Sequence, residues 1–300
     1  MNQFTGFLKR HSLLSGVILM FALTWPIDLA NSGVLPFRVS EAAAIFVGYG
    51  LVSASLLMTG LTLGKHGVVT LLKRFLIWRV SWKWYLVAFL LMPSMQFVSV
   101  LLTALVRQSP IDFSDVYAYK IFGPSINLVL LIVPFFLFDA IANGEEIAWR
   151  GYVLPRLQAK HSALVSSLFV GVIWGLWHLP KHLSHWDTTT FVFFMAGITA
   201  RAVLYTWLYN NTKGSLLLTT LFHASGNTGG ILLPIATTAI AGNLTASIIQ
   251  LLLEVAVVVI VTVRAGAARL SRTEPKQIQD DVLQPENTDL PVRSLEGAIK

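Results

Sequence analysis

Residues 143–156 read NGEEIAWRGYVLPR and place two adjacent carboxylates, Glu145 and Glu146, and the cation Arg150 in an otherwise apolar part of the chain. A charged side chain at the middle of a membrane costs about 2.5–3.5 kcal/mol on insertion scales, so such groups usually serve a function. Glu146 and Arg150 are four residues apart and share a helix face, so they are expected to pair, fix each other's orientation and balance charge. The stretch therefore predicts a functional site.

The composition is typical of a protein embedded in a lipid bilayer. Of the 300 residues, 55% are hydrophobic and only 12% are charged, whereas soluble domains have about 25% charged residues. Cysteine is absent, which excludes disulfides, thiolate metal sites and cysteine nucleophiles. The expected fold is all-α, a polytopic membrane protein.

Runs of about 17–25 mostly apolar residues are long enough to cross the bilayer as helices. About eight transmembrane helices that enclose an intramembrane polar cavity are predicted at residues 12–30, 41–63, 84–106, 124–147, 163–180, 190–209, 215–233 and 244–263. The first run could instead be the apolar region of a signal peptide, although Pro26 and Asp28 interrupt a small-residue cleavage site.

The net charge of +7 comes from short segments between the apolar runs. Because cytoplasmic loops are rich in lysine and arginine, the loops at 65–83 and 156–160 are expected to be cytoplasmic, with both termini on that side of the cell membrane. No nucleic-acid partner is needed to explain these charges. The segment from Thr70 to Trp84 fits either a basic amphipathic helix on the membrane surface or a plain loop.

The chain is expected to divide into four parts. Residues 1–123 hold the N-terminal helices and the basic loop, residues 124–233 carry the candidate site, and residues 234–263 form the last helix. Residues 264–300 are polar, with equal numbers of acidic and basic side chains. Such a segment cannot bury enough surface to fold alone, so a disordered cytoplasmic tail is predicted.

Two consecutive spans, 124–147 and 163–180, are expected to form a helical hairpin that turns near residues 160–162. At about 1.5 Å per residue, Glu145 and His178 each lie about 22–24 Å from that turn. The two side chains should therefore face each other across the hairpin.

The span at 215–233 brings two more polar groups to the same depth. His223 and Asn227 lie about 14 and 20 Å into this span, and at a spacing of four residues they share a helix face. A solvated helix end or interhelical hydrogen bonding would explain any one such group alone. These explanations are weak for the whole set, which is Glu145, Glu146, Arg150, His178, His223 and Asn227.

The order and spacing of these groups resemble the three motifs of the CAAX-protease and bacteriocin-processing family of intramembrane proteases, also called the Abi family. The motifs are Glu145-Glu146-x-x-x-Arg150, Trp174-x-x-x-His178 and His223-x-x-x-Asn227. Trp174 is a departure, because the family usually has phenylalanine there. The resemblance covers residues 124–233 as a catalytic core.

The resemblance implies an endopeptidase that hydrolyses a peptide bond of a membrane-associated protein or peptide. It implies that Glu145 with His178 activates a water molecule, while His223 and Asn227 face the developing oxyanion. These roles suit the side chains, because a desolvated glutamate can act as a base and then as an acid, and polar donors stabilise an oxyanion.

A bound metal is left open by the sequence. Imidazoles and carboxylates could form a zinc site with an open position, for which the ligands would be Glu145, His178 and His223. The family has been described both as metalloproteases and as glutamate-dependent enzymes. The His-Glu-x-x-His signature is absent, so a permanently bound zinc is not expected.

Other functions remain as alternatives. A non-catalytic membrane scaffold or a bacteriocin self-immunity protein would keep the fold and bind a partner, but it would tolerate loss of a glutamate or histidine, whereas all six positions are occupied here. A proton-coupled transporter is a third interpretation. Arg201 and Glu254, near mid-depth, could pair with each other or line a water or substrate path. These two and Asp139 are left outside the predicted site.

Overall fold

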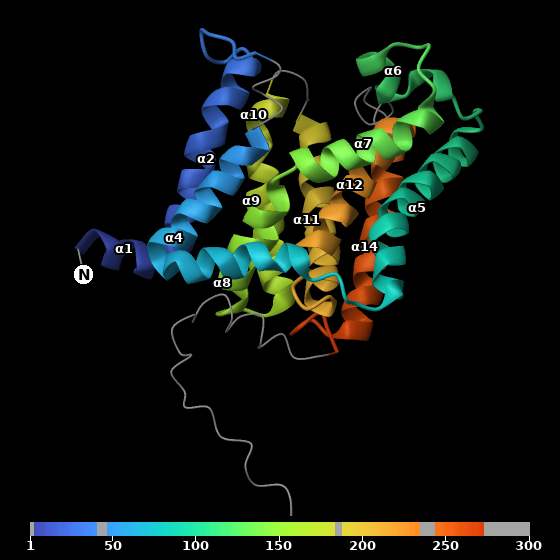
Figure 1. Ribbon diagram of the computed structural model, residues 1–300. Helices are drawn as coiled ribbons and strands as arrows, with labels where there is room; N and C mark the ends of the chain where they lie inside the picture. Colours follow the sequence, from blue (N-terminus) through green and yellow to red (C-terminus); the bar gives the residue numbers. More distant parts are fainter. Residues whose placement is uncertain (1–2, 41–46, 184–187, 235–243, 273–300) are drawn as a thin grey trace, which may run out of the picture.

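The computed structural model describes residues 3–40, 47–183, 188–234 and 244–272. Every regular element in these ranges is a helix (Figure 1), which confirms the all-α prediction. The elements are α1 (Gln3–Arg10), α2 (Ser12–Asn31), α4 (Val47–Lys73), η1 (Arg74–Leu76), α5 (Trp82–Arg107), η2 (Phe113–Asp115), α6 (Tyr117–Phe122), α7 (Leu128–Ala142), η3 (Ile147–Val153), α8 (Leu154–Gln158), α9 (Ala163–Trp177), α10 (Leu179–His182), α11 (Thr188–Asn211), α12 (Leu216–Leu232) and α14 (Leu244–Ala265).

Within the described ranges, five helices are long and apolar enough to cross a membrane: α2, α4 with η1, α5, α11 and α14. A sixth crossing results if α7 and the segment η3–α8 are one bent span. The eight predicted spans are therefore not confirmed. α9 has 15 residues and α12 has 17, fewer than the roughly 20 that a crossing helix needs. His178 caps the C-terminal end of α9, and His223 lies within α12.

The fourth predicted span is broken. The segment η3–α8 is bent by 42° from α7, and in Figure 1 α7 runs across one end of the bundle. Asn143 lies in the break, where its Oδ1 accepts the backbone N–H of Glu145 at 2.9 Å. Glu145 and Glu146 therefore begin the second helical segment, whereas the sequence predicted one span over 124–147 that continues to Lys160.

The break is held against α4 by a close backbone approach. A Cβ atom at Gly144 would lie 2.8 Å from the carbonyl oxygen of Gly48, so only glycine fits there without displacing one of the chains. Nearby, the hydroxyl of Tyr49 donates to the carbonyl of Ile141 at 2.9 Å. Contacts with α4 therefore set the position at which the two carboxylates enter the bundle.

The basic segment after the second predicted span is partly helical. α4 contains a break at Gly64, where φ is 68°, and the helix then continues to Lys73 and through η1. After η1 the chain is irregular up to Ser81, beyond which α5 begins. The predicted amphipathic segment from Thr70 to Trp84 is thus a helix at its two ends and a loop between them.

The centre of the bundle is packed through small residues. Gly171 and Gly175 of α9 face α11, because a Cβ on Gly171 would meet Thr199 and one on Gly175 would meet Met195 and Ile198. Small residues let membrane helices approach closely. Because α9 packs closely against α11, which also contacts α12 and η3, the three segments that carry the predicted motifs surround α11.

Part of the predicted disordered tail is ordered. The backbone N–H groups of Ala163 and Leu164, at the start of α9, donate to the carbonyls of Ala268 and Ala267 at 2.8 and 3.0 Å. Asn211 donates to the carbonyl of Leu270 at 2.8 Å. The chain after α14 therefore caps a helix end that would otherwise lack hydrogen-bond acceptors. The rest of the predicted tail, 273–300, lies outside the described residues.

Candidate active site

The first carboxylate motif leads into a turn of π-helix. η3 spans Ile147 to Val153, and all seven of its residues are buried. Single π-helical turns are rare and occur frequently at functional sites. The wider turn follows directly after Glu146 and includes Arg150.

Glu146 links two elements through one oxygen. Its Oε1 accepts from Nη1 of Arg150 at 2.9 Å and lies 2.8 Å from Nδ1 of His223 on α12. The Glu146–Arg150 pair is the one expected from their spacing, but the contact with His223 is not. All three side chains are buried, with Arg150 at 0% exposure, so the group forms the inner wall of the site.

The guanidinium of Arg150 lies between two aromatic rings. Its Cζ is 4.0 Å from the ring centre of Tyr205 and 4.4 Å from that of Trp174. Cation–π contacts of this kind are worth about 2 kcal/mol or more when desolvated. Tyr205 also packs edge-on to Trp174 and His223, at 5.4 and 5.7 Å between ring centres. Tyr205 is a site residue that the sequence analysis did not identify.

Glu145 is less buried than Glu146 and has aromatic donors as partners. Its Oε2 accepts from the indole N–H of Trp174 at 2.5 Å and from that of Trp149 at 3.4 Å. Both indole N–H groups therefore point to the carboxylate of Glu145. The side chain is therefore held between η3 and α9.

His178 lies at the C-terminal end of α9. Its Nδ1 is 2.9 Å from the carbonyl oxygen of Trp174, so this nitrogen carries the proton, and in the neutral ring Nε2 carries the lone pair. The ring packs against Trp177 at 4.7 Å and Phe194 at 5.3 Å between centres. Because Trp174 contacts both Glu145 and His178, the two predicted partners lie around one indole.

Asn227 faces a carboxylate that the prediction left outside the site. Its Nδ2 is 3.1 and 3.2 Å from the two carboxylate oxygens of Asp139 on α7. Asp139 and Glu145 are both close enough to His223 for a direct electrostatic interaction. The sequence marks Asp139 only as a charged residue inside the apolar run of α7. Its partner could not be predicted, because the bend after α7 turns Asp139 toward α12.

The other mid-depth charges form a separate pair. Nε of Arg201 lies 3.5 Å from Oε1 of Glu254, and the same oxygen accepts from Nε2 of Gln250 at 2.8 Å. Arg201 and Glu254 therefore pair across α11 and α14, one of the two arrangements considered from the sequence.

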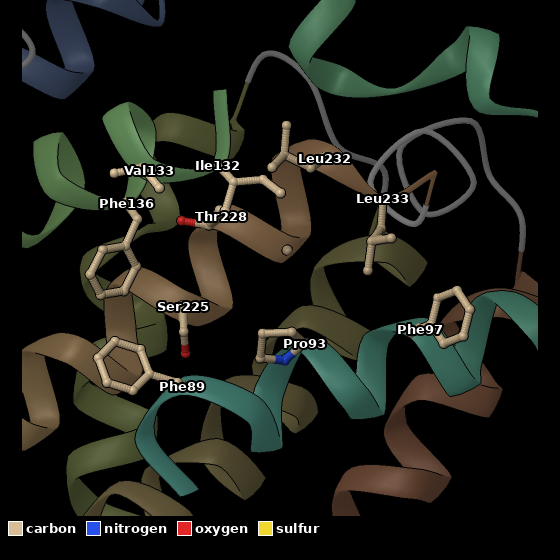
Figure 2. A pocket seen from close by; sticks show the side chains of 11 residues that line it. Phe89, Pro93, Phe97, Ile132, Val133, Phe136, Ser225, Thr228, Leu232 and Leu233 are labelled. Carbon is tan, nitrogen blue, oxygen red and sulfur yellow. The ribbon is translucent and has the colours of Figure 1, made fainter. Parts of the chain in front are cut away.

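An apolar cavity of about 520 Å³ lies beside the site, between α5, α7 and α12 (Figure 2). Phe89, Pro93 and Phe97 of α5 line one side, and Ile132, Val133 and Phe136 of α7 line another. The third side is the C-terminal half of α12, with Ser225, Thr228, Gly229, Leu232 and Leu233. Asn227 lies in this part of α12, and Asp139 is one helical turn beyond Phe136.

The proposed zinc ligands do not fit one shared ion in this arrangement. Within the described residues, no three histidine or carboxylate side chains are placed to hold a metal. Oε2 of Glu145 accepts two indole N–H groups. Nδ1 of His223 and of His178 point to Glu146 and to a backbone carbonyl, which leaves Nε2 of each ring for another partner.

The central region of the chain is similar to known proteins. Residues 125–229 match the family model of the Type II CAAX prenyl endopeptidase Rce1-like proteins, within the region 124–233 marked out by the sequence. Over 147 residues the chain is 29% identical to CAAX prenyl protease 2 of Methanococcus maripaludis, an alignment that covers 46% of this chain and about half (52%) of the relative. Both comparisons show that the central region is similar to CAAX prenyl endopeptidases, in agreement with the resemblance of residues 124–233 to the CAAX-protease and bacteriocin-processing family.

Proposed function

We propose that the protein is a membrane-embedded endopeptidase that cleaves a peptide bond of a membrane-associated protein or peptide. The observation that carries the proposal is the contact between Glu146 and His223 at 2.8 Å, which joins the first and third motifs inside a buried core. The similarity of residues 125–229 to the Rce1-like CAAX prenyl endopeptidase model supports the same activity. A non-catalytic scaffold would not need a buried cluster of charged groups, which is expensive to maintain.

The proposed water-activating pair is Glu145 with His178. Both side chains are only partly buried, whereas Glu146 and Arg150 are fully buried, so the first two are the groups that water and substrate can reach. In the neutral ring, Nε2 of His178 can accept a hydrogen bond from the attacking water and orient it, while the carboxylate of Glu145 takes one proton from that water and later passes it to the leaving amine. Water attack on the carbonyl then forms a tetrahedral intermediate.

The proposed oxyanion donors are His223 and Asn227. The N–H at Nδ1 of His223 donates a hydrogen bond to Glu146, whose charge stabilises the imidazolium form, and this form presents a second N–H on Nε2. Asp139 orients the amide of Asn227, whose nitrogen carries two hydrogens. Preorganised donors at the developing negative charge usually supply a large share of the rate enhancement.

The apolar cavity supports a substrate with an apolar group near the cleaved bond. It has almost wholly apolar walls and adjoins Asn227 along α12. The relative from M. maripaludis is named a prenyl protease, and a prenylated peptide is the substrate class that we propose to test first. The cavity volume of about 520 Å³ is within the common range for small-molecule pockets.

The test uses the full chain in lipid nanodiscs and an internally quenched peptide with a farnesylated C-terminal CAAX sequence. The wild-type protein should cleave the peptide, and Glu145→Ala, His178→Ala and His223→Ala should each lower kcat by about a hundredfold or more without changing thermal unfolding. Asp112→Asn, at the exposed residue that caps the start of η2, is the matched control and should retain activity. Cleavage by Glu145→Ala at the wild-type rate would end the catalytic assignment.

An unprenylated twin of the peptide separates substrate recognition from chemistry. Cleavage of both peptides at equal rates would remove the prenyl proposal and leave the protease proposal in place. If neither is cleaved, comparison of membrane peptides from cells with wild-type protein or with Glu145→Ala decides between another substrate and a non-catalytic scaffold. Identical peptide profiles would favour the scaffold.

A further inference from the structure

Trp174 touches both members of the proposed water-activating pair. Its indole N–H donates to Oε2 of Glu145 at 2.5 Å, and its backbone carbonyl lies 2.9 Å from Nδ1 of His178. The first contact sets the position of a carboxylate, and the second sets the tautomer of an imidazole. We propose that Trp174 is a positioning residue that aligns Glu145 with His178, an inference that rests on the proposed protease function.

Trp174 is itself fixed in place by its neighbours. The side chain is buried, with the guanidinium of Arg150 over its ring at 4.4 Å. The rings of Tyr205 and His223 lie at 5.4 and 5.6 Å from its centre. A ring confined on these sides cannot change rotamer without displacing Arg150, so its N–H direction is determined before substrate binds. Such preorganisation is what catalytic geometry requires of a supporting side chain.

Trp149 provides an internal comparison. Its indole N–H approaches the same oxygen of Glu145 at 3.4 Å, beyond the usual length of an N–H···O hydrogen bond of about 2.7–3.2 Å. The Trp174 contact is the closer of the two, at 2.5 Å. Trp174 is therefore the donor that determines where the carboxylate of Glu145 lies.

Phenylalanine is the informative substitution. Trp174→Phe retains an aromatic face for Arg150 and His223 but removes the donor to Glu145, and the backbone carbonyl that meets His178 is unchanged. Loss of a hydrogen bond to a charged group typically corresponds to a roughly tenfold effect or more. Trp174→Phe should therefore lower kcat about tenfold and leave KM for the farnesylated peptide unchanged.

Two further variants distinguish positioning from packing. Trp149→Phe should lose less activity than Trp174→Phe. Trp207→Phe removes an indole that packs against Trp84 at 5.0 Å, outside the site, and should leave kcat unchanged. An equal loss of kcat in Trp207→Phe and Trp174→Phe, or a change in KM alone for Trp174→Phe, would overturn the proposal.

A spectroscopic readout tests the contact without proteolysis. The indole N–H signal of Trp174 in a ¹H–¹⁵N spectrum of the detergent-solubilised protein is identified by its absence in Trp174→Phe. It should shift in Glu145→Gln, and an unchanged position would overturn the proposal. The signal could shift in Glu145→Gln even though the wild-type protein leaves the farnesylated peptide intact. That result would support the contact between Trp174 and Glu145 and contradict the proposed activity on this peptide.

Discussion

Glu146 and His223 are 77 residues apart in the chain, yet their side chains meet at 2.8 Å inside the bundle. Arg150 binds the same carboxylate oxygen at 2.9 Å, so one buried carboxylate oxygen has two partners, of which Arg150 is the cation. Removing one partner from a buried ion pair leaves an uncompensated charge and costs about 3–5 kcal/mol.

Arg150→Met should therefore lower the free energy of unfolding by about 3–5 kcal/mol. The double variant Glu146→Gln with Arg150→Met should lose less than the sum of the two single variants, because the unpaired carboxylate is then gone. Denaturant unfolding of the detergent-solubilised protein, followed by circular dichroism, measures both. Additive losses would show that the two side chains do not act on each other.

The contact between Asn227 and Asp139 predicts that Asp139 affects catalysis by orienting the amide of Asn227. Asp139→Asn keeps the size of the side chain but removes the charged acceptor at 3.1 and 3.2 Å, so the amide of Asn227 loses its fixed orientation. We expect kcat on the farnesylated peptide to fall about tenfold with unfolding unchanged. If Asp139→Asn retained full kcat, Asp139 would have no role in orienting Asn227.

Local patterns predicted the parts of the site that depend on spacing within one helix. The Glu146–Arg150 pair and the shared depth of the three motifs follow from helix periodicity, which is visible in the sequence. The helical class follows from composition, because an apolar chain in lipid must satisfy its backbone within each segment.

Features that depend on tertiary contacts were not predictable in this way. The apolar run 124–147 gives no sign of its bend, since the bend depends on the approach of Gly144 to Gly48 of another helix. The same bend turns Asp139 toward α12. Tyr205 resembles an ordinary core aromatic in the sequence, and only the packing of α11 against α9 and α12 reveals that it supports Arg150.

The Arg201–Glu254 pair is expected to stabilise the fold and not to take part in the reaction. Arg201→Gln and Glu254→Gln should each destabilise the protein, and a double-mutant cycle should give a coupling energy of about 0.5–3 kcal/mol. The activity per folded molecule should stay unchanged, because the pair lies between α11 and α14. A loss of kcat in well-folded Glu254→Gln would show that this pair belongs to a water or substrate path.

The donor arrangement also predicts the response to chelators. Because no three histidine or carboxylate side chains of the described residues are placed together to hold a metal, we expect cleavage of the farnesylated peptide to continue after incubation with 1,10-phenanthroline. Metal content measured on the same sample provides the control. Activity that is lost with the chelator and restored by added zinc would show that these side chains rearrange to bind a metal.

The absence of cysteine from the chain allows the predicted orientation to be measured with single introduced thiols. Lys213 lies between α11 and α12, and Asp112 follows α5; both side chains are exposed. If the basic loops are cytoplasmic, as their charge indicates, a membrane-impermeant maleimide should label Asp112→Cys in intact cells. The same reagent should label Lys213→Cys only after permeabilisation. The reverse pattern would mean that the topology is inverted. Labelling of both variants in intact cells would place both residues outside the cell and contradict the prediction that they lie on opposite sides of the membrane.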